Sequence, residues 1–375
     1  MKKRILIVAT IDRHIEKFHL PYIKEFKKMG YEVHVATNGY KELENVDKKI
    51  TIPIQRTPFS IKNIFSIFEL RRIIKKNNYE IIHCHTPMGS VVTRLAAKNI
   101  KKVSSPFVVY TAHGFHFFKG ASKVNWLIYY NIEKVLSKYT DLILTINNED
   151  YKLAKEKFYC NIEYVPGVGI DLSKFIPKTE SLYVSNRKKI GISNSSFVIT
   201  YVAELSNRKN QEVLIRAMSR LCEKYDNLKL YLIGDGPNVE EYKNLVKQLN
   251  LEDDVIFSGY QSDVTKYLYA SDMLVSSSKQ EGLPVNILEG MSIGLPIVVS
   301  NCRGNIDLIK NGYNGLIVEN DSMSFEQAIE KIFLDKNLRD KLGEKNLLEI
   351  KKYSLQDVVN QTMEKIFTTK EGRDN

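Results

Sequence analysis

Two glutamates separated by seven residues form the part of the sequence that most directly suggests chemistry. Glu281 is followed by Gly282, Leu283 and Pro284, and Glu289 comes later in the same segment. A helix that opens at Pro284 would present free amides to a diphosphate, because proline suits a first helical turn and glycine lets the backbone approach a ligand. The amides in question are those of Gly282, Leu283 and Val285. Glu289 could then accept hydrogen bonds from ribose hydroxyls and Glu281 from a sugar. The alternative is that Glu281 is a solvated helix cap and Glu289 is merely exposed.

His113 lies at the end of an expected strand and before Gly114, where an open α/β sheet presents residues to its ligand. It could instead be a buried, hydrogen-bonded side chain. Metal binding by His83, Cys84 and His85 is a further alternative. Alternation along a strand places His83 and His85 on one face and Cys84 on the other, so only two of the three could share an ion. We therefore favour structural roles for His83 and Cys84.

Other cofactor signals are missing from the sequence. No Asp-x-Asp pair occurs, and the four cysteines are scattered without a Cys-x-x-Cys pair. We therefore expect no metal site, no cofactor and no need for a metal. The glycine pairs at 167–169 and 234–236 do not extend to Gly-x-Gly-x-x-Gly, so a nicotinamide-binding fingerprint is absent. We expect Gly234 and Asp235 to form a turn beside a nucleotide instead.

Short apolar runs that alternate with segments of helical period must position these residues. We expect buried strands at Arg4–Thr10, Tyr31–Thr37, Glu80–Thr86, Phe107–His113, Asp141–Ile146, Phe197–Ala203, Lys229–Gly234, Val255–Gly259, Met273–Ser277 and Pro296–Ser300. This rhythm predicts the α/β class, with two doubly wound parallel sheets. The interruption at 166–194 is the expected linker, with its hinge near 167–171. The predicted domains are 1–170 and 171–353, and a final amphipathic helix over 354–375 packs back on the first domain.

Length and composition limit the class of protein. A chain of 375 residues favours two domains, and 43% hydrophobic with 26% charged residues is ordinary for a globular protein. Neither a signal peptide nor an uncharged run long enough to span a membrane is found, so we expect a cytoplasmic location. Residues 1–180 carry 30 Lys and Arg against 17 Asp and Glu, a net charge of +13. This half therefore suits an anionic partner, either nucleic acid or a membrane with acidic lipids.

The Glu-x7-Glu segment with its Gly-Leu-Pro resembles the motif of family 4 retaining glycosyltransferases of the GT-B fold. Other stretches carry the resemblance over nearly the whole chain, namely 232–237, 255–259, 270–272, 294–300 and 311–315. The stretches His83-Cys-His-Thr-Pro87 and Tyr110-Thr-Ala-His-Gly-Phe-His-Phe-Phe118 resemble enzymes of bacterial capsule and exopolysaccharide synthesis. The resemblance implies two Rossmann-like domains that face a central cleft, with the donor bound mainly by the second.

The resemblance also implies roles for individual residues. Glu281 and His113 would face the donor sugar, Glu289 the ribose, and Gly282 with Leu283 the phosphates, with Pro284 and Val285 as further donor-binding residues. Many members supply an Arg and, five residues later, a Lys to the diphosphate. Here Lys209 matches the Lys, Glu204 stands at the Arg position, and Arg208 is the expected substitute cation. The remaining expected donor contacts are Gly234, Asp235, Gly259 and Tyr260.

The basic first domain is the expected acceptor side. A helix over 61–77 combines apolar residues with basic residues near its end, so it is either a core helix with a basic last turn or a surface that touches anionic lipid. An aromatic stretch from Phe115 to Tyr130 lies among lysines and could border an acceptor pocket, with His116, Phe117 and Lys119 as acceptor-side residues.

These observations favour transfer, with retention of configuration, of a hexose or N-acetylhexosamine from a UDP-sugar to a polyprenyl-diphosphate-linked saccharide. The expected setting is capsule or exopolysaccharide synthesis at the inner membrane face, with other polysaccharide-assembly enzymes as further partners. A nucleotide-sugar epimerase of the same architecture and a catalytically silent binding subunit are the alternatives. Nucleic-acid binding is disfavoured because no known binding module is recognisable.

Overall fold

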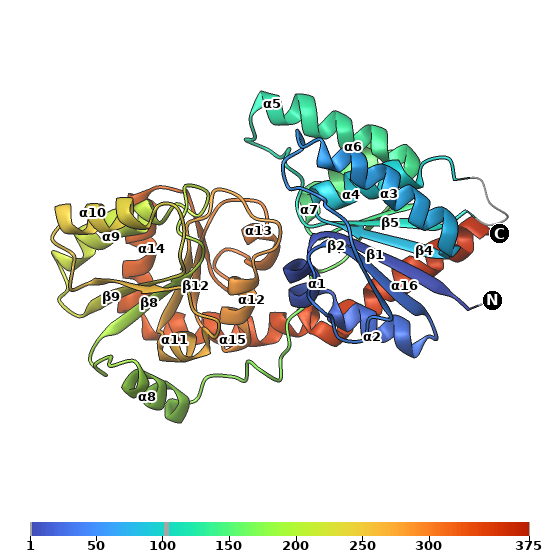
Figure 1. Ribbon diagram of the computed structural model, residues 1–375. Coiled ribbons are helices and arrows are strands. Elements are labelled where there is room, and N and C mark those ends of the chain that lie inside the picture. The colour runs from blue at the N-terminus through green and yellow to red at the C-terminus, as the bar shows by residue number, and fades with distance from the viewer. Residues whose placement is uncertain (1, 101–104, 375) are drawn as a thin grey trace. The chain divides into compact units, whose positions relative to one another are not determined.

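The computed structural model describes residues 2–100 and 105–374. The chain forms two compact units, one of Met1–Val168 with Gln356–Asn375 and the other of Gly169–Leu355. The unit limits lie two residues from the limits expected at 170 and 353. Each unit is a parallel sheet with helices on both faces (Figure 1), so the predicted α/β class with two doubly wound sheets is confirmed.

The sheet of the first unit has seven strands in the order β3-β2-β1-β4-β5-β6-β7. Their bounds are β1 Arg4–Ile11, β2 Glu32–Asn38, β3 Lys48–Thr51, β4 Ile81–His85, β5 Phe107–Ala112, β6 Leu142–Thr145 and β7 Asn161–Tyr164. The strand order reverses direction between β1 and β4. Apolar β-branched runs fill the central strands because both faces are covered by helices.

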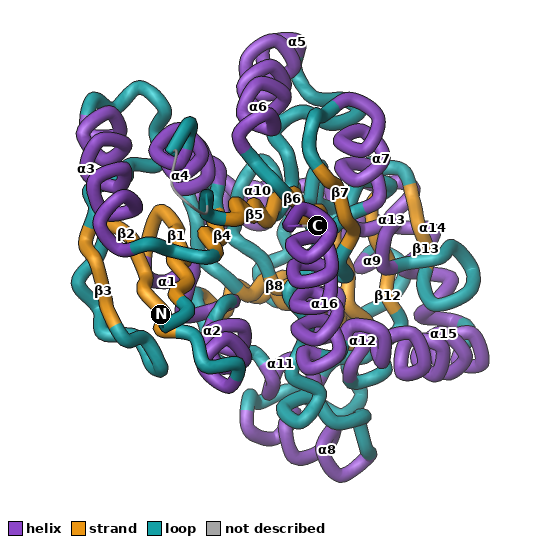
Figure 2. The backbone as a smooth tube through the Cα atoms, turned by 90° about the vertical axis from the view of Figure 1, so that its right-hand side faces the viewer, coloured by secondary structure: helices purple, strands orange, loops and turns teal. Residues whose placement is uncertain are grey.

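Helices on opposite faces of this sheet come from different parts of the chain. One face carries α3, α4 and α6, and the other carries α2 and the C-terminal α16 (Figure 2). Phe367 of α16 packs against Phe26 and Tyr31, with ring centroids 6.2 Å apart in both cases. The bounds are α1 Asp12–Phe18, α2 Leu20–Lys28, α3 Lys62–Asn77, α4 Pro87–Ala97, α5 Lys123–Asn125, a π-helical turn Trp126–Tyr130, α6 Asn131–Leu136, a 3-10 turn Ser137–Tyr139, α7 Asn148–Lys157 and α16 Leu355–Asp374.

The second unit repeats the design with six strands in the order β10-β9-β8-β11-β12-β13, reversing between β8 and β11. The strands are β8 Phe197–Val202, β9 Leu228–Ile233, β10 Val255–Gly259, β11 Met273–Ser276, β12 Ile297–Ser300 and β13 Leu316–Val318. The helices are α8 Glu180–Lys189, α9 Gln211–Cys222, α10 Val239–Gln248, α11 Thr265–Ala270, α12 Val285–Ser292, α13 Asn305–Leu308, α14 Ser322–Leu334, α15 Lys336–Glu349 and a 3-10 turn Ile350–Tyr353. One core lies between the sheet and α9, α10 and α14, and another lies beneath α11 and α12.

The expected linker at 166–194 is wrong in its second half. Residues 180–189 form α8, whose Arg187 side chain is fully buried and donates a hydrogen bond to Asp272 at 2.5 Å and another to the Ala270 carbonyl at 3.1 Å. The prolines and basic cluster suggested a loop, but Thr179 caps the helix by accepting from the Leu182 amide. Among the described helices, none is long and apolar enough to cross a membrane.

Candidate functional site

The central strands of the second sheet end side by side and place two loops together. Leu274 of β11 pairs with Thr200 of β8, and each strand ends two residues later. The loop after β8 leads to Arg208 and Lys209, and the loop after β11 leads to Glu281. Open α/β sheets bind ligands outside the carboxyl ends of their strands at such a reversal of strand order. The fold therefore brings these predicted residues to the expected edge.

Glu281 is the centre of an ion cluster at this edge. Its carboxylate accepts hydrogen bonds from Lys209 Nζ, from Arg208 Nη1 at 3.2 Å and from Ser278 Oγ at 2.6 Å. The Glu281 side chain is 9% exposed and the Lys209 side chain 11%, whereas Arg208 is 45% exposed. Glu281 is thus a buried, paired carboxylate. The alternative that it is a solvated helix cap is wrong.

Backbone and hydroxyl contacts hold the two loops in place. Tyr201 OH donates to the Lys209 carbonyl at 3.1 Å and is hydrogen-bonded to Ser278 Oγ at 2.8 Å. Ser277 Oγ donates to the same Lys209 carbonyl at 3.0 Å. These buried hydroxyls fix Lys209 and Glu281 before any ligand arrives, and no sequence motif identifies them. Their only sequence signal is the run of serines after an expected strand.

The segment after Glu281 leads into α12 as expected, with Pro284 as the residue before the first helical turn. Gly304 lies against it: a Cβ on Gly304 would come within 2.7 Å of Glu281 Cβ and 2.9 Å of the Gly282 carbonyl oxygen. Arg303 Nε donates to the Glu281 carbonyl at 3.0 Å. Glu289 is half-buried on α12. The loop after β12 therefore supports the segment from behind, a contact that the sequence motif does not reveal.

The glycine turn after β9 packs against the loop that follows β8. A Cβ on Gly234 would lie 1.9 Å from the Ala203 carbonyl oxygen, so only glycine fits. Asp235 and Gly259 are exposed beside this loop, and Tyr260 is 64% exposed. Glu204, at the position where the family resemblance implied an Arg, is 57% exposed and lies 4.0 Å from Arg208 Nη2. Arg208 thus partly balances the charge of Glu204.

The corresponding edge of the first sheet gathers five histidines. His83 and His85 point to one face of β4, with ring centroids 4.1 Å apart, while Cys84 Sγ donates to the Val109 carbonyl on the neighbouring strand. The expected alternation is confirmed, and His83 Nε2 is hydrogen-bonded to Thr111 Oγ1 at 2.7 Å. His113 follows β5 directly.

The remaining members of this group, His14 and His19, come from α1 and the residue after it. The His14 and His113 ring centroids are 4.9 Å apart, and His19 stacks on His85 at 3.7 Å. The sequence pattern raised metal binding only at 83–85, whereas the structure brings His14, His19 and His113 together instead. Neither His14 nor His19 lies in an expected strand, so the sequence pattern gave no signal for them.

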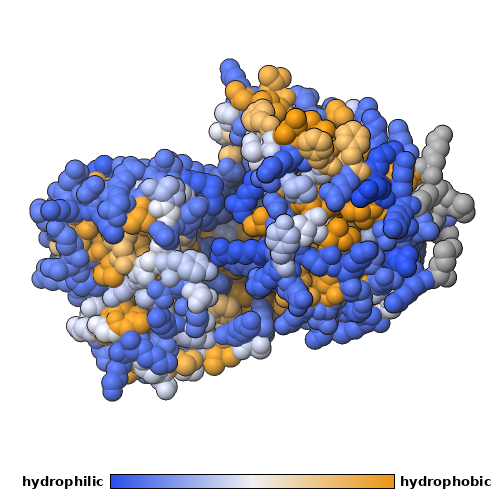
Figure 3. Space-filling model, in the orientation of Figure 1, coloured by the Kyte–Doolittle hydropathy of each residue, from blue (hydrophilic) through white to orange (hydrophobic). Residues whose placement is uncertain are grey.

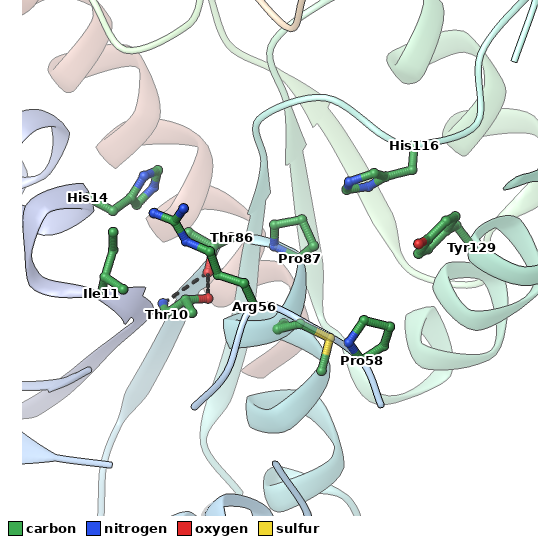
Figure 4. A pocket seen from close by; sticks show the side chains of 10 residues that line it. Thr10, Ile11, His14, Arg56, Pro58, Thr86, Pro87, His116 and Tyr129 are labelled. Atoms are coloured by element: carbon green, nitrogen blue, oxygen red, sulfur yellow. Dashed lines mark hydrogen bonds between the residues drawn. The ribbon is translucent and has the colours of Figure 1, made fainter. Parts of the chain in front are cut away.

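A pocket of about 320 Å³ opens at the same edge of the first unit. His14 and Arg56 stand on one side of it and His116 and Tyr129 on the other (Figure 4). Thr86, in its floor, has a φ of 62°, and its Oγ1 accepts a hydrogen bond from the Thr10 amide at 3.0 Å. A β-branched residue rarely adopts a positive φ, and strain of this kind is concentrated at functional sites.

The three expected acceptor-side residues lie in different surroundings. His116 lines the pocket and stacks on Tyr129, with ring centroids 4.9 Å apart. Phe117 has no exposed surface and stacks on Phe115 at 4.8 Å, so it belongs to the core and its expected contact with an acceptor is wrong. Lys119 is exposed but is not among the residues that line the pocket. An aromatic and basic pattern does not distinguish a core residue from a pocket residue.

The chain has two doubly wound units, of which one carries a cation and carboxylate cluster at its strand reversal and the other carries a pocket. This combination defines the class of two-domain α/β enzymes with the GT-B architecture. The family described as "Glycosyl transferases group 1" matches residues 184–347, and "Glycosyl transferase 4-like" matches residues 4–147. EpsD of Bacillus subtilis (strain 168), named as a glycosyltransferase, is 42% identical over 347 residues, which cover 92% of this chain and 91% of EpsD. The chain therefore belongs to the family 4 glycosyltransferases, and this prediction is confirmed.

Two further similarities extend this assignment. The Escherichia coli UDP-Gal:alpha-D-GlcNAc-diphosphoundecaprenol alpha-1,3-galactosyltransferase is 33% identical over 285 residues, which cover 74% of this chain and 72% of that enzyme. The crystal structure of Anabaena HepE in complex with UDP has a TM-score of 0.79 at 18% identity and covers 98% of this chain and 100% of that one. This likeness confirms the predicted GT-B fold.

Proposed function

We propose that the protein transfers a hexose or N-acetylhexosamine from a UDP-sugar, with retention of configuration, to a saccharide carried on polyprenyl diphosphate. The cluster of Lys209, Arg208 and Glu281 at the strand reversal is the observation that carries the donor half of this proposal. The name of the Escherichia coli relative supports the acceptor half. Capsule or exopolysaccharide assembly, alongside other enzymes of that process, is the proposed setting.

Departure of UDP concentrates negative charge on the diphosphate, and positioned cations together with free helix amides stabilise that charge. Lys209 and Arg208 supply the cations, and Gly282, Leu283 and Val285 at the start of α12 supply the amides. Glu289 accepts from the ribose, Glu281 faces the sugar, and the exposed Asp235, Gly259 and Tyr260 border the nucleotide. Because two cations are already at hand, we propose that no divalent metal is needed at the diphosphate.

Incubation of the purified protein with a panel of UDP-sugars and a synthetic polyprenyl-diphosphate saccharide tests the transfer. We expect product to form only when both substrates are present. The NMR spectrum of the product should show the anomeric configuration of the donor. Addition of Mg²⁺ or Mn²⁺ should not increase the rate. Donor turnover without an acceptor would identify an epimerase instead. Donor binding without any turnover would identify a silent subunit. Inverted product would overturn retention.

We propose that the pocket in Figure 4 receives the acceptor. Its size lies within the usual range for ligand sites, which is about 300–1,000 Å³. Aromatic rings such as His116 and Tyr129 suit contact with a sugar face, and Arg56 suits a phosphate. We expect Tyr129→Ala to raise the KM for acceptor about tenfold or more and to leave UDP affinity unchanged. The exposed Tyr159→Ala, outside the pocket lining, is the control; an unchanged acceptor KM in Tyr129→Ala contradicts the assignment.

A membrane surface is the proposed location, because the helices over this unit expose large apolar side chains. Phe65 and Phe68 of α3 are 62% and 67% exposed, Phe59 before α3 is 92% exposed, and Leu127 is 71% exposed. Figure 3 shows apolar residues gathered over the segment from α5 to α6. Leu70 and Ile74 of α3 are buried in the core of the unit, so the interpretation as a core helix holds for one face. Ile64, Phe65 and Phe68 are exposed on the rest of the helix. Basic residues of α3 lie close by in the sequence, as expected for contact with anionic lipid.

Flotation with liposomes tests this location. We expect binding to vesicles with acidic lipids, weaker binding to neutral vesicles, and loss of binding in the double variant Phe65→Glu, Phe68→Glu. Leu334→Glu, at an exposed apolar position of the second unit, is the matched control and should float like the unmodified protein. Binding that is indifferent to lipid charge and to the double variant contradicts the proposal.

A further inference from the structure

Three imidazoles of the first unit converge on one point. One ring nitrogen from each of His14, His19 and His113 lies within 4.8 Å of the other two. The Nε2 atom of each ring is buried and has no hydrogen-bond partner among the residues described. His19 itself is only 3% exposed. Buried polar atoms in proteins are nearly always partnered, so three converging rings that each carry an unpartnered buried nitrogen indicate a shared ligand.

The chemical state of the rings suits a cation. Burial lowers the pKa of His14 to about 4 and holds the pKa values of His19 and His113 well below their usual range. The rings are therefore neutral at pH 7, which is the form of histidine that binds metals. The groups that influence these three pKa values are other histidines and Arg56, with no carboxylate among them. Imidazole nitrogens without carboxylate oxygens suit Zn²⁺, Cu²⁺ or Ni²⁺ rather than Mg²⁺ or Ca²⁺.

The spacing of the rings is compatible with such an ion. Tetrahedral Zn²⁺ with nitrogen ligands at about 2.0–2.1 Å places those nitrogens about 3.3 Å apart. Nitrogens that lie up to 4.8 Å apart reach this spacing when each ring shifts inward by less than about 1 Å, within the range of a small rotamer adjustment. His85 stacks on His19 at 3.7 Å, and its buried Nδ1 also lacks a partner among the described residues. His85 therefore closes the group from the sheet side.

We propose that His14, His19 and His113 form a binding site for one transition-metal cation of the Zn²⁺ type. Three protein ligands leave the fourth tetrahedral position to an oxygen from solvent or from a ligand. His14 also lines the 320 Å³ pocket, so the proposed site borders that pocket. The site goes beyond the proposed transfer reaction, whose diphosphate contacts lie on Lys209 and Arg208 in the second unit.

Metal binding is measured on the untagged full-length protein, without any substrate, so that the result is independent of the transfer reaction. Chelator-treated and dialysed protein is titrated with Zn²⁺ in a calorimeter, and Co²⁺ is used as a spectroscopic substitute. We expect one Zn²⁺ per chain and visible Co²⁺ absorption of a tetrahedral site. Each of three single variants should weaken Zn²⁺ binding by about 10–100-fold or more, namely His14→Gln, His19→Gln and His113→Gln. Loss of a residue that only supports a metal ligand already weakens binding by about this factor.

His34→Gln is the matched control. His34 is also buried, but its Nδ1 is hydrogen-bonded to Tyr79 OH at 2.7 Å and its Nε2 to Glu32 at 2.9 Å, outside the group. It should bind Zn²⁺ like the unmodified protein. Circular dichroism establishes that each variant is folded, and UDP titration tests the second unit separately. Absence of stoichiometric Zn²⁺ binding in folded protein, or equal binding by all three ligand variants, overturns the proposal.

Discussion

Replacing Lys209 with methionine tests the donor site most directly. The change removes the ammonium group but keeps much of the side-chain volume. Lys209 and Glu281 are 11% and 9% exposed, so their ion pair is largely shielded from water. Breaking a buried pair costs about 3–5 kcal/mol when the remaining charge has no other partner. Glu281 keeps Ser278 at 2.6 Å and Arg208 at 3.2 Å, so we expect a smaller loss of unfolding free energy, about 2 kcal/mol.

The same substitution should have a larger effect on catalysis. A hydrogen bond to a charged group contributes about 1.5–3 kcal/mol, which corresponds to UDP binding that is roughly 10–100-fold weaker. Loss of a group that stabilises charge in the transition state lowers kcat by about 10²–10³-fold. Calorimetry with UDP and the transfer assay measure the two effects, and chemical denaturation measures stability.

Lys229→Met is the matched control for Lys209→Met. Lys229 pairs with Asp254 at 2.7 Å and is 25% exposed, but it lies at the start of β9, where the strands begin rather than end. We expect a stability loss below about 1 kcal/mol and unchanged UDP affinity. If Lys209→Met binds UDP and turns over as well as Lys229→Met does, the assignment of Lys209 to the diphosphate is refuted.

Three further predictions follow from contacts in both units. Glu281→Gln frees Lys209 from its carboxylate, so calorimetry should show UDP binding as tight as before or tighter, while transfer falls by about 100-fold or more; weaker UDP binding contradicts this. Gly304→Ala would place a Cβ 2.7 Å from Glu281 Cβ, at a residue whose φ is 84°. Chemical denaturation should therefore show a loss of unfolding free energy of about 1–3 kcal/mol. The loss should exceed that in Gly312→Ala, because Gly312 also has a positive φ but has open space around it. Burial lowers the pKa of His14 to about 4 and of His83 to about 3, so the unfolded chain takes up protons first as the pH falls below about 6.5. Each of these two histidines should then reduce unfolding free energy by about 1.4 kcal/mol per pH unit down to its folded pKa; a flat profile between pH 6.5 and 4 contradicts this.

The central strands were predictable because helices cover both of their faces. All ten expected strands are present with ends within two residues, and the three that were missed are β3, β7 and β13. β3 lies at the sheet edge with the sequence Lys-Lys-Ile-Thr, and none of its four residues is buried. β13 has only three residues. Short, half-exposed edge strands lack the continuous apolar run that identifies a buried strand.

The candidate sites were predictable where a local motif existed and unpredictable where only strand register brings residues together. Glu281 and Lys209 follow from motifs, but Ser278 and Gly304 act through contacts that no motif encodes. The histidine group is assembled because β1, β4 and β5 are aligned in parallel register, Val8 with Cys84 and Cys84 with Tyr110. Sequence separation hides such a group, since its members follow different strands.

The first unit is built from the two ends of the chain, with α16 packed on the face that α2 shares. Besides Phe367, Lys370 pairs with Glu80 at 3.2 Å and Lys365 with Glu163 at 2.9 Å. During synthesis on the ribosome, one apolar face of the amino-terminal sheet therefore stays partly uncovered until the intervening domain and α16 have been synthesised. A shortened chain that stops before residue 356 should expose this apolar face and be bound by chaperones or cleaved by proteases.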